Sequence, residues 1–178
     1  MADPDIYEAI DALGGIPFSG RVYRHVTPGT DCCSGEAARR FGGRWNPPNS
    51  FPVVYSSLTP ESSAAEFRKL AQRNALRPVD LLPREFFTLE IALGSVLDLR
   101  PERSLEQVSL GFGDISSDEM TRCQFVGEAA YRLNYEGIVA ASSTGVGHVM
   151  AIFPLKLRLS SRLGTVGSTT WNIPQDVP

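Results

Sequence analysis

Hydrophobic and polar positions change their period several times along the chain, and these changes predict short strands separated by helices. Residues 5–13 place Ile6, Ala9, Ile10 and Leu13 on one face of a helix, which Gly14-Gly15 ends. A longer helix is predicted over residues 60–73, with Thr59 as its N-cap and proline at its first position. Further helices are predicted over residues 104–111 and 119–133.

The helix over residues 60–73 has two faces of different character. Its apolar positions are Ala64, Phe67, Leu70 and Ala71, and its predicted solvated face carries Arg68, Lys69 and Gln72. Glu66 does not fit this division, because it lies between Ala65 and Phe67 and close to the apolar face. A carboxylate in such a place needs polar partners. A structural salt bridge with Arg24 or Arg44 and a catalytic role are both consistent with it.

Strands are predicted over residues 20–26, 52–55, 85–93, 96–99, 137–141 and 148–153, and residues 155–159 are expected to extend the sheet. In the first of these, alternation places Arg24 on the same face as Val22 and Val26. An exposed edge strand would explain this arginine, and so would an arginine that lines a pocket. Residues 165–178, which are rich in serine, threonine and proline, are predicted to form a loosely ordered tail.

Strands and helices follow one another here without a regular βαβ rhythm. This favours an α+β fold with a curved, mostly antiparallel sheet and flanking helices. The length of 178 residues is typical of a single domain. We expect an N-terminal helix or cap over residues 1–20, the main domain over 21–160 and a C-terminal tail over 161–178.

Composition and charge exclude several classes of function. The net charge of −3 argues against a general nucleic-acid binder, and no apolar run is long enough to span a bilayer. The acidic N-terminus is not a signal peptide, so a cytoplasmic location is expected. Cys32, Cys33 and Cys123 form no disulfide framework, and with only His25 and His148 beside them no metal site is predicted.

Residues 35–66 bring the most distinctive candidate chemistry together. Gly42-Gly43 precedes Arg44, a predicted strand ends at Tyr55, and the next helix carries Glu66. The segment thus joins a fixed cation, an aromatic ring and a carboxylate through glycines and prolines. The common phosphate-loop, dinucleotide, zinc-protease and hydrolase motifs are missing from the sequence. A small-residue loop with Ser142-Ser143 follows a strand and is a weak candidate for anion binding.

Several of these blocks resemble the RES domain family. They are Tyr23-Arg24, SGEAARRFGGRWNPP over residues 34–48, Pro52 to Tyr55, Ala65-Glu66, CQFVG over residues 123–127, and the serine after Gly137-Ile138. The resemblance runs from about Arg21 to Phe153. It implies a fold like that of the ADP-ribosyltransferases. It also implies a toxin of a bacterial toxin–antitoxin pair, whose antitoxin carries a Xre-type helix-turn-helix domain.

The resemblance also assigns roles to individual residues. Arg24, Glu66 and Ser142 take the positions of the family's arginine, glutamate and serine, although Ser143 is an alternative for the last. Arg44, Tyr55 and His25 are the implied NAD⁺-binding residues. No cofactor is implied, since NAD⁺ is the substrate and inorganic phosphate its potential co-substrate.

The activity implied by the family is cleavage of the bond between nicotinamide and ribose. Phosphate as the acceptor would make the protein an NAD⁺ phosphorylase, and water would make it a glycohydrolase. Transfer of ADP-ribose to a protein is the second enzymatic alternative. A module that binds NAD⁺ or ADP-ribose without turnover is the non-enzymatic one.

Overall fold

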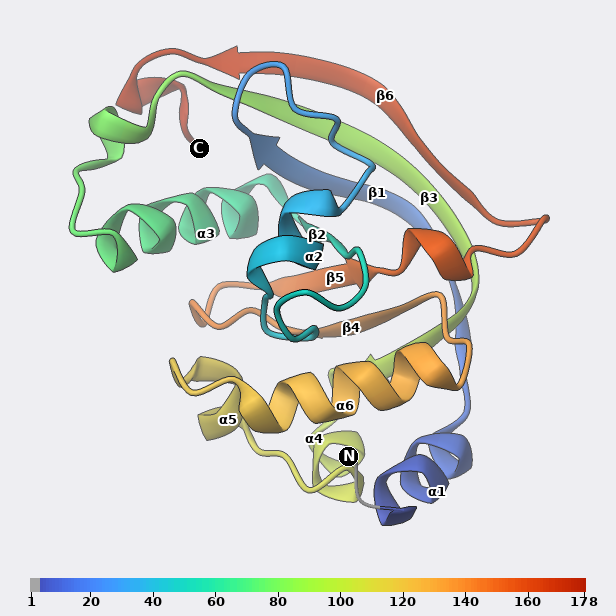
Figure 1. Ribbon diagram of the computed structural model, residues 1–178. Coiled ribbons are helices and arrows are strands. Elements are labelled where there is room, and N and C mark those ends of the chain that lie inside the picture. Colours follow the sequence, from blue (N-terminus) through green and yellow to red (C-terminus); the bar gives the residue numbers. More distant parts are fainter. Residues whose placement is uncertain (1–3) are drawn as a thin grey trace.

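The computed structural model describes residues 4–178, and Figure 1 shows the arrangement of their helices and strands. The α-helices are α1 (Pro4–Leu13), α2 (Glu36–Phe41), α3 (Pro60–Arg73), α4 (Glu102–Gln107), α5 (Phe112–Ser116) and α6 (Thr121–Arg132). The strands are β1 (Ile16–Val26), β2 (Val54–Ser57), β3 (Arg84–Leu99), β4 (Gly137–Ala141), β5 (His148–Ile152) and β6 (Arg162–Trp171). Short 3-10 helices are η1 (Pro78–Leu81), η2 (Pro154–Lys156) and η3 (Pro174–Asp176).

The strands form one six-stranded sheet that closes on itself. Its order is β1-β2-β5-β4-β3-β6. A further ladder pairs β1 with β3 and so closes the sheet. The closure depends on the length of β3, whose first half pairs with β1 and β6 while Val96–Leu99 pairs with β4. Only the β3–β4 ladder is parallel among those in the described residues. The predicted α+β fold with a mostly antiparallel sheet is therefore confirmed.

The short central strands are buried on both faces. In β4, Ile138 and Ala140 point into a cluster with α1, α6 and Trp45, whereas Val139 points into a second cluster inside the closed sheet. This alternation follows from the two-residue period of a strand. It explains why β4 and β5 are almost continuously apolar. In Figure 1, α6 lies below β4 and β5, with α1, α4 and α5 around it.

The C-terminal region differs from the prediction. Residues 162–171 form β6 instead of a loose tail, and they pair antiparallel with β3 from Ala92 to Arg84. Most side chains of β6 are exposed, so their polar character gave no strand pattern. The strand is anchored by Trp171, which packs with Phe67 of α3 and Phe86 of β3 at centroid distances of 5.6 and 4.6 Å.

Three smaller predictions are also corrected. The strands expected over 85–93 and 96–99 are one continuous strand, β3. The sheet extension over 155–159 is wrong, because η2 and a turn occupy this region. Residues 112–116 form α5, an additional helix between those predicted over 104–111 and 119–133.

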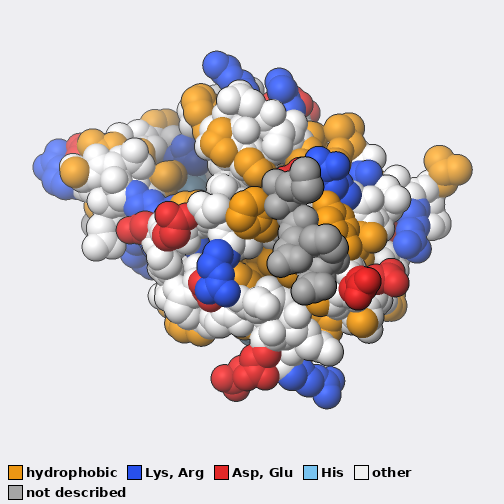
Figure 2. Space-filling model, turned by 60° about the horizontal axis from the view of Figure 1, so that its bottom comes forward, with side chains coloured by type: hydrophobic (Ala, Val, Ile, Leu, Met, Phe, Trp, Pro, Cys, Tyr) orange, Lys and Arg blue, Asp and Glu red, His pale blue; other side chains and the backbone are white. Residues whose placement is uncertain are grey.

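The face that carries α1 and α4 shows mixed charge. Acidic and basic side chains alternate on it with hydrophobic ones, and neither sign forms a continuous field (Figure 2). This agrees with the small net charge of −3. Among residues 4–178, the helices are all too short or too polar to cross a membrane.

Candidate active site

A pocket of about 420 Å³ opens between β1, the turn before β2, helix α3 and the start of α6. Five of the predicted site residues line it: Arg24, His25, Arg44, Tyr55 and Glu66. Its charged lining consists of Glu66, Arg24, Arg44, Lys69 and Arg73. One carboxylate therefore faces four cations, as expected of a site for an anionic ligand.

Helix α3 brings Glu66 to the pocket. Thr59 caps the helix, since its Oγ1 accepts the N–H of Ser62 at 3.1 Å, and Pro60 takes the first position. Phe67 is fully buried beside it, so Glu66 lies where the core meets the pocket. Glu66 forms no ion pair with any residue from 4 to 178. The alternative of a structural salt bridge is therefore wrong.

A chain of hydrogen bonds from the loop after β4 ends on Glu66. Ser142 is fully buried, and its hydroxyl donates to Glu66 Oε1 at 2.7 Å. The Ser142 oxygen accepts the Thr144 N–H at 3.1 Å and lies 2.6 Å from Thr144 Oγ1. Since the Ser142 proton is used on Glu66, the Thr144 hydroxyl donates to Ser142 and its oxygen accepts the Val146 N–H at 3.1 Å. Every donor in this chain points toward Glu66, whose carboxyl oxygen is the final acceptor.

The two adjacent serines form hydrogen bonds with side chains of opposite charge. Ser142 contacts Glu66, whereas Ser143 lines the pocket and accepts from Lys69 Nζ, at 2.9 Å through its carbonyl and 3.1 Å through its hydroxyl. The contact with the carboxylate supports Ser142 as the counterpart of the family serine.

Arg24 lies between two buried valines of β1, as the alternation predicts, and it lines the pocket. Its Nη1 donates to the Tyr55 carbonyl at 2.5 Å, while its buried Nε has no partner within residues 4–178. Burial lowers the pKa of the guanidinium, and the nearby Cys32, Cys33 and Asp31 act in the opposite direction. The pocket-lining interpretation is thus confirmed, and the exposed-edge interpretation is wrong.

Tyr55 holds the turn over residues 42–46 in place. Its hydroxyl donates to Asn46 Oδ1 at 2.8 Å and accepts the Trp45 N–H at 2.8 Å. Burial raises the pKa of the phenol, which keeps its donor proton. Gly43 packs directly on the ring, since a Cβ there would lie 2.6 Å from Tyr55. Only glycine permits this approach.

Helix α6 clamps the same turn from the other side. Gln124 Nε2 donates to the Gly43 carbonyl at 3.0 Å. One helical turn later, Gly127 lies against Trp45, and a Cβ on Gly127 would be 1.9 Å from the Trp45 carbonyl oxygen. The CQFVG block therefore supports the GGRWN turn, which explains in physical terms why both blocks occur in one sequence.

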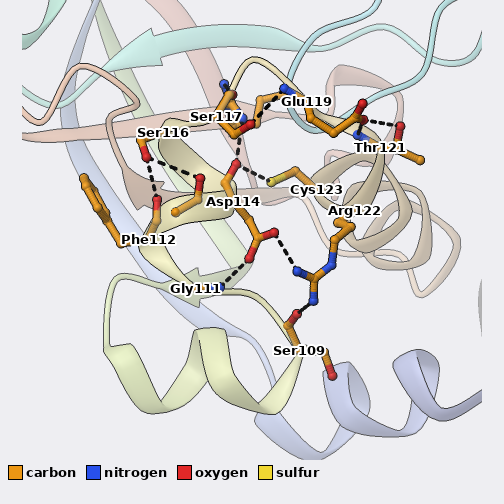
Figure 3. Close-up of polar contacts among 12 residues, drawn as sticks. Ser109, Gly111, Phe112, Asp114, Ser116, Ser117, Glu119, Thr121, Arg122 and Cys123 are labelled. Atoms are coloured by element: carbon orange, nitrogen blue, oxygen red, sulfur yellow. Dashed lines mark hydrogen bonds and ion pairs between the residues drawn. The ribbon is translucent and has the colours of Figure 1, made fainter.

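Arg44 ties the pocket wall to α5. Its Nη1 and Nη2 donate to the carbonyls of Asp114 and Ser117 at 3.0 and 2.7 Å. Figure 3 shows that Asp114 is itself fixed, because its carboxylate accepts the Gly111 N–H at 2.8 Å and pairs with Arg122 at 2.6 Å. Arg44 thus has a positioning role, and its contact with substrate stays a prediction.

His25 lies on the opposite face of β1 from Arg24, packed against Phe67 and Trp171. Its Nδ1 accepts from Arg84 Nε at 3.2 Å. Burial, together with the charges of Arg84 and Arg24, lowers the pKa of His25 to about 3. The imidazole is therefore neutral near pH 7, and it adds no charge to the pocket.

Two pocket residues were missed from the sequence. Lys69 was assigned to the solvated face of α3 and Arg73 was given no role, yet both line the pocket. Burial lowers the pKa of Lys69, and the neighbouring Arg73 contributes in the same direction. The signal was present in the spacing, since residues 66, 69 and 73 recur at helical positions on one face.

Comparison with known proteins agrees with this geometry. The family model for the RES domain matches residues 21–174, so the chain belongs to the RES domain family. The match reaches beyond the predicted boundary at residue 160 and includes β6.

Its relatives give the family a more specific context. The protein named NAD(+) phosphorylase MbcT, from Mycobacterium tuberculosis and from Mycobacterium bovis, is 35% identical over 158 residues, which cover 88% of this chain and 85% of the relative. In the solved structures, the M. tuberculosis MbcT–MbcA toxin–antitoxin complex contains a similar chain. Its TM-score is 0.89 at 30% identity, with 98% of this chain and 97% of that chain covered.

Proposed function

We propose that this protein is an NAD⁺ phosphorylase that acts as the toxin of a toxin–antitoxin pair. The observation that carries the proposal is the pocket in which one serine-bound carboxylate faces four cations. The 35% identity to relatives named NAD(+) phosphorylase supports the same reaction.

Glu66 acts on the bond between nicotinamide and ribose. When this bond breaks, its electron pair goes to the nicotinamide nitrogen, and positive charge develops on the ribose, as in glycoside cleavage. A carboxylate fixed before the reaction stabilises that charge without having to reorganise. The Ser142 hydroxyl fixes Glu66 by its 2.7 Å hydrogen bond, so Ser142 is a positioning residue.

The 35% identity to relatives named NAD(+) phosphorylase favours phosphate as the acceptor. Among residues 4–178, the pocket cations without a carboxylate partner are Arg24, Arg44 and Lys69, whereas Arg73 pairs with Asp118 at 3.4 Å. Lys69 is well placed to hold the acceptor phosphate, because it lies one helical turn from Glu66 and is held by Ser143 at 2.9 Å. A phosphate oxygen would then bond to the ribose carbon as nicotinamide leaves, which gives a phosphorylated ADP-ribose.

Tyr55 and His25 complete the substrate site in this proposal. The hydroxyl of Tyr55 is occupied by Asn46 and Trp45, so its remaining contribution is its ring, which lines the pocket. An electron-rich ring attracts the cationic nicotinamide. His25 contributes an uncharged side chain to the pocket lining near pH 7, since its pKa is lowered to about 3.

The partner and the location are part of the same proposal. A similar chain is found in the MbcT–MbcA toxin–antitoxin complex, which supports an antitoxin for this protein. We further propose that the antitoxin has a Xre-type helix-turn-helix domain, that both act in the cytoplasm, and that the closed sheet is related to the ADP-ribosyltransferases.

The proposal is tested by comparing the native chain with Glu66→Gln for loss of NAD⁺. The glutamine keeps an oxygen that accepts from Ser142 but removes the charge. We expect the variant to fold with unchanged thermal stability and to lose NAD⁺ consumption by about a thousandfold, the scale on which a preorganised group contributes. Full activity in Glu66→Gln would refute the catalytic assignment. NAD⁺ binding without consumption by the native chain would favour a binding module.

A further inference from the structure

Three side chains with metal-binding atoms converge in the loop between β1 and α2. Asp31, Cys32 and Cys33 place a carboxylate oxygen and two sulfurs within 4.8 Å of one another. Both cysteines are free, and their Sγ atoms lie 3.7 Å apart. The proposed NAD⁺ reaction uses none of these groups.

The distance between the two sulfurs fits a tetrahedral ion. With a zinc–sulfur bond of about 2.3 Å, two thiolates on one tetrahedral ion lie about 3.8 Å apart. Cys32 and Cys33 already meet this spacing, so chelation needs little movement. Asp31 is oriented as well, because its Oδ1 accepts the Cys33 N–H at 2.9 Å.

The surroundings fix one side of this cluster and leave the other open. Cys32 is buried, and its Sγ lies 3.4 Å from Thr165 Oγ1 of β6. Cys33 is half-buried and Asp31 is exposed, so an ion can enter from solvent. The same open side leaves room for water as a fourth ligand.

We propose that Asp31, Cys32 and Cys33 bind a thiophilic divalent cation of the Zn²⁺ type. Binding replaces the two thiol protons with one doubly charged ion, and both protons are released to solvent. The net charge of the cluster therefore stays at −1. This charge suits the neighbouring Arg24. This proposal departs from the sequence analysis, which predicted no metal site.

A disulfide between the adjacent cysteines is the competing interpretation. The two Sγ atoms lie 3.7 Å apart, which is far beyond the bond length of about 2.05 Å of a disulfide. A disulfide would also make no use of the Asp31 carboxylate, which lies within 4.8 Å of both sulfurs.

The site is tested by titrating the full-length, reduced and chelator-treated protein with Co²⁺. We expect one equivalent to produce a near-ultraviolet sulfur-to-cobalt absorption band, which Zn²⁺ then abolishes by displacement. Cys33→Ser loses the band. Asp31→Asn keeps it with an affinity about tenfold to a hundredfold lower.

Cys123→Ala is the matched control, because Cys123 is a free cysteine on the buried face of α6, outside the Asp31–Cys32–Cys33 group. It is expected to titrate like the native chain. An absent band, or one that persists in Cys33→Ser, would overturn the proposal. So would a native chain that binds no Co²⁺ but forms a Cys32–Cys33 disulfide with a mild disulfide oxidant. Circular dichroism of each variant establishes that it is folded before titration.

Discussion

Replacing Ser142 with alanine removes the hydroxyl that donates to Glu66 while leaving the carboxylate itself in place. The hydrogen bond is 2.7 Å long and its donor is fully buried. Water could therefore replace the hydroxyl only by entering the cavity that the substitution leaves. A hydrogen bond to a charged group contributes about 1.5–3 kcal/mol. If the transition state loses that amount of stabilisation by Glu66, the rate falls about 10- to 100-fold.

The assay is the initial rate of nicotinamide release at several NAD⁺ concentrations. We expect the loss in Ser142→Ala to appear in kcat more than in KM, because the bond orients a reacting group. Ser143→Ala is the matched control, since its backbone carbonyl still accepts from Lys69 at 2.9 Å. It should lose less than about fivefold, because only one of the two hydrogen bonds from Lys69 is removed and the carbonyl keeps the other. An unchanged kcat in Ser142→Ala, or a larger loss in Ser143→Ala, would refute the assignment.

Two further predictions concern stability. Gly127→Ala places a Cβ 1.9 Å from the Trp45 carbonyl, so we expect a loss of about 2 kcal/mol or more in the free energy of unfolding, measured with urea, together with reduced activity. The pKa of His25 in the folded protein, about 3, lies below its ordinary value of about 6.5. Between these two values the unfolded chain binds more protons than the folded one. The free energy of unfolding therefore falls as the pH drops from about 6.5 toward 3, by up to about 1.4 kcal/mol per pH unit. His25→Asn keeps an acceptor for Arg84 and should flatten this slope in urea unfolding; an equally steep slope in the variant would contradict the prediction.

The helices that could be predicted from the sequence bury one face. Helices α1, α3 and α6 have amphipathic periods, and their observed bounds are close to the predicted ones. The sequence did not predict strand β6, because this strand pairs through its backbone at the edge of the sheet, where most of its side chains are exposed. Its buried anchor, Trp171, depends on contacts with α3 and β3 that lie far away in the sequence.

The candidate site was predictable where a charge stood among apolar residues. Arg24 and Glu66 were noticed for that reason, and both line the pocket. The role of Lys69 was not predictable in the same way. Its partner Ser143 is 74 positions away, and helical spacing placed Lys69 opposite the apolar face. The anchoring of Trp45 by the Tyr55 hydroxyl likewise depends on how the turn folds back on β2.

The measurement that most directly tests the proposed reaction is NMR of the purified protein with NAD⁺, with and without inorganic phosphate. Proton spectra follow the release of nicotinamide, and phosphorus spectra follow the product. We predict release that depends on phosphate, together with a new phosphorus signal from phosphorylated ADP-ribose. Release at the same rate without phosphate would contradict the phosphorylase and indicate a glycohydrolase. Intact NAD⁺ under both conditions would contradict both activities and leave transfer to a protein acceptor, or binding alone.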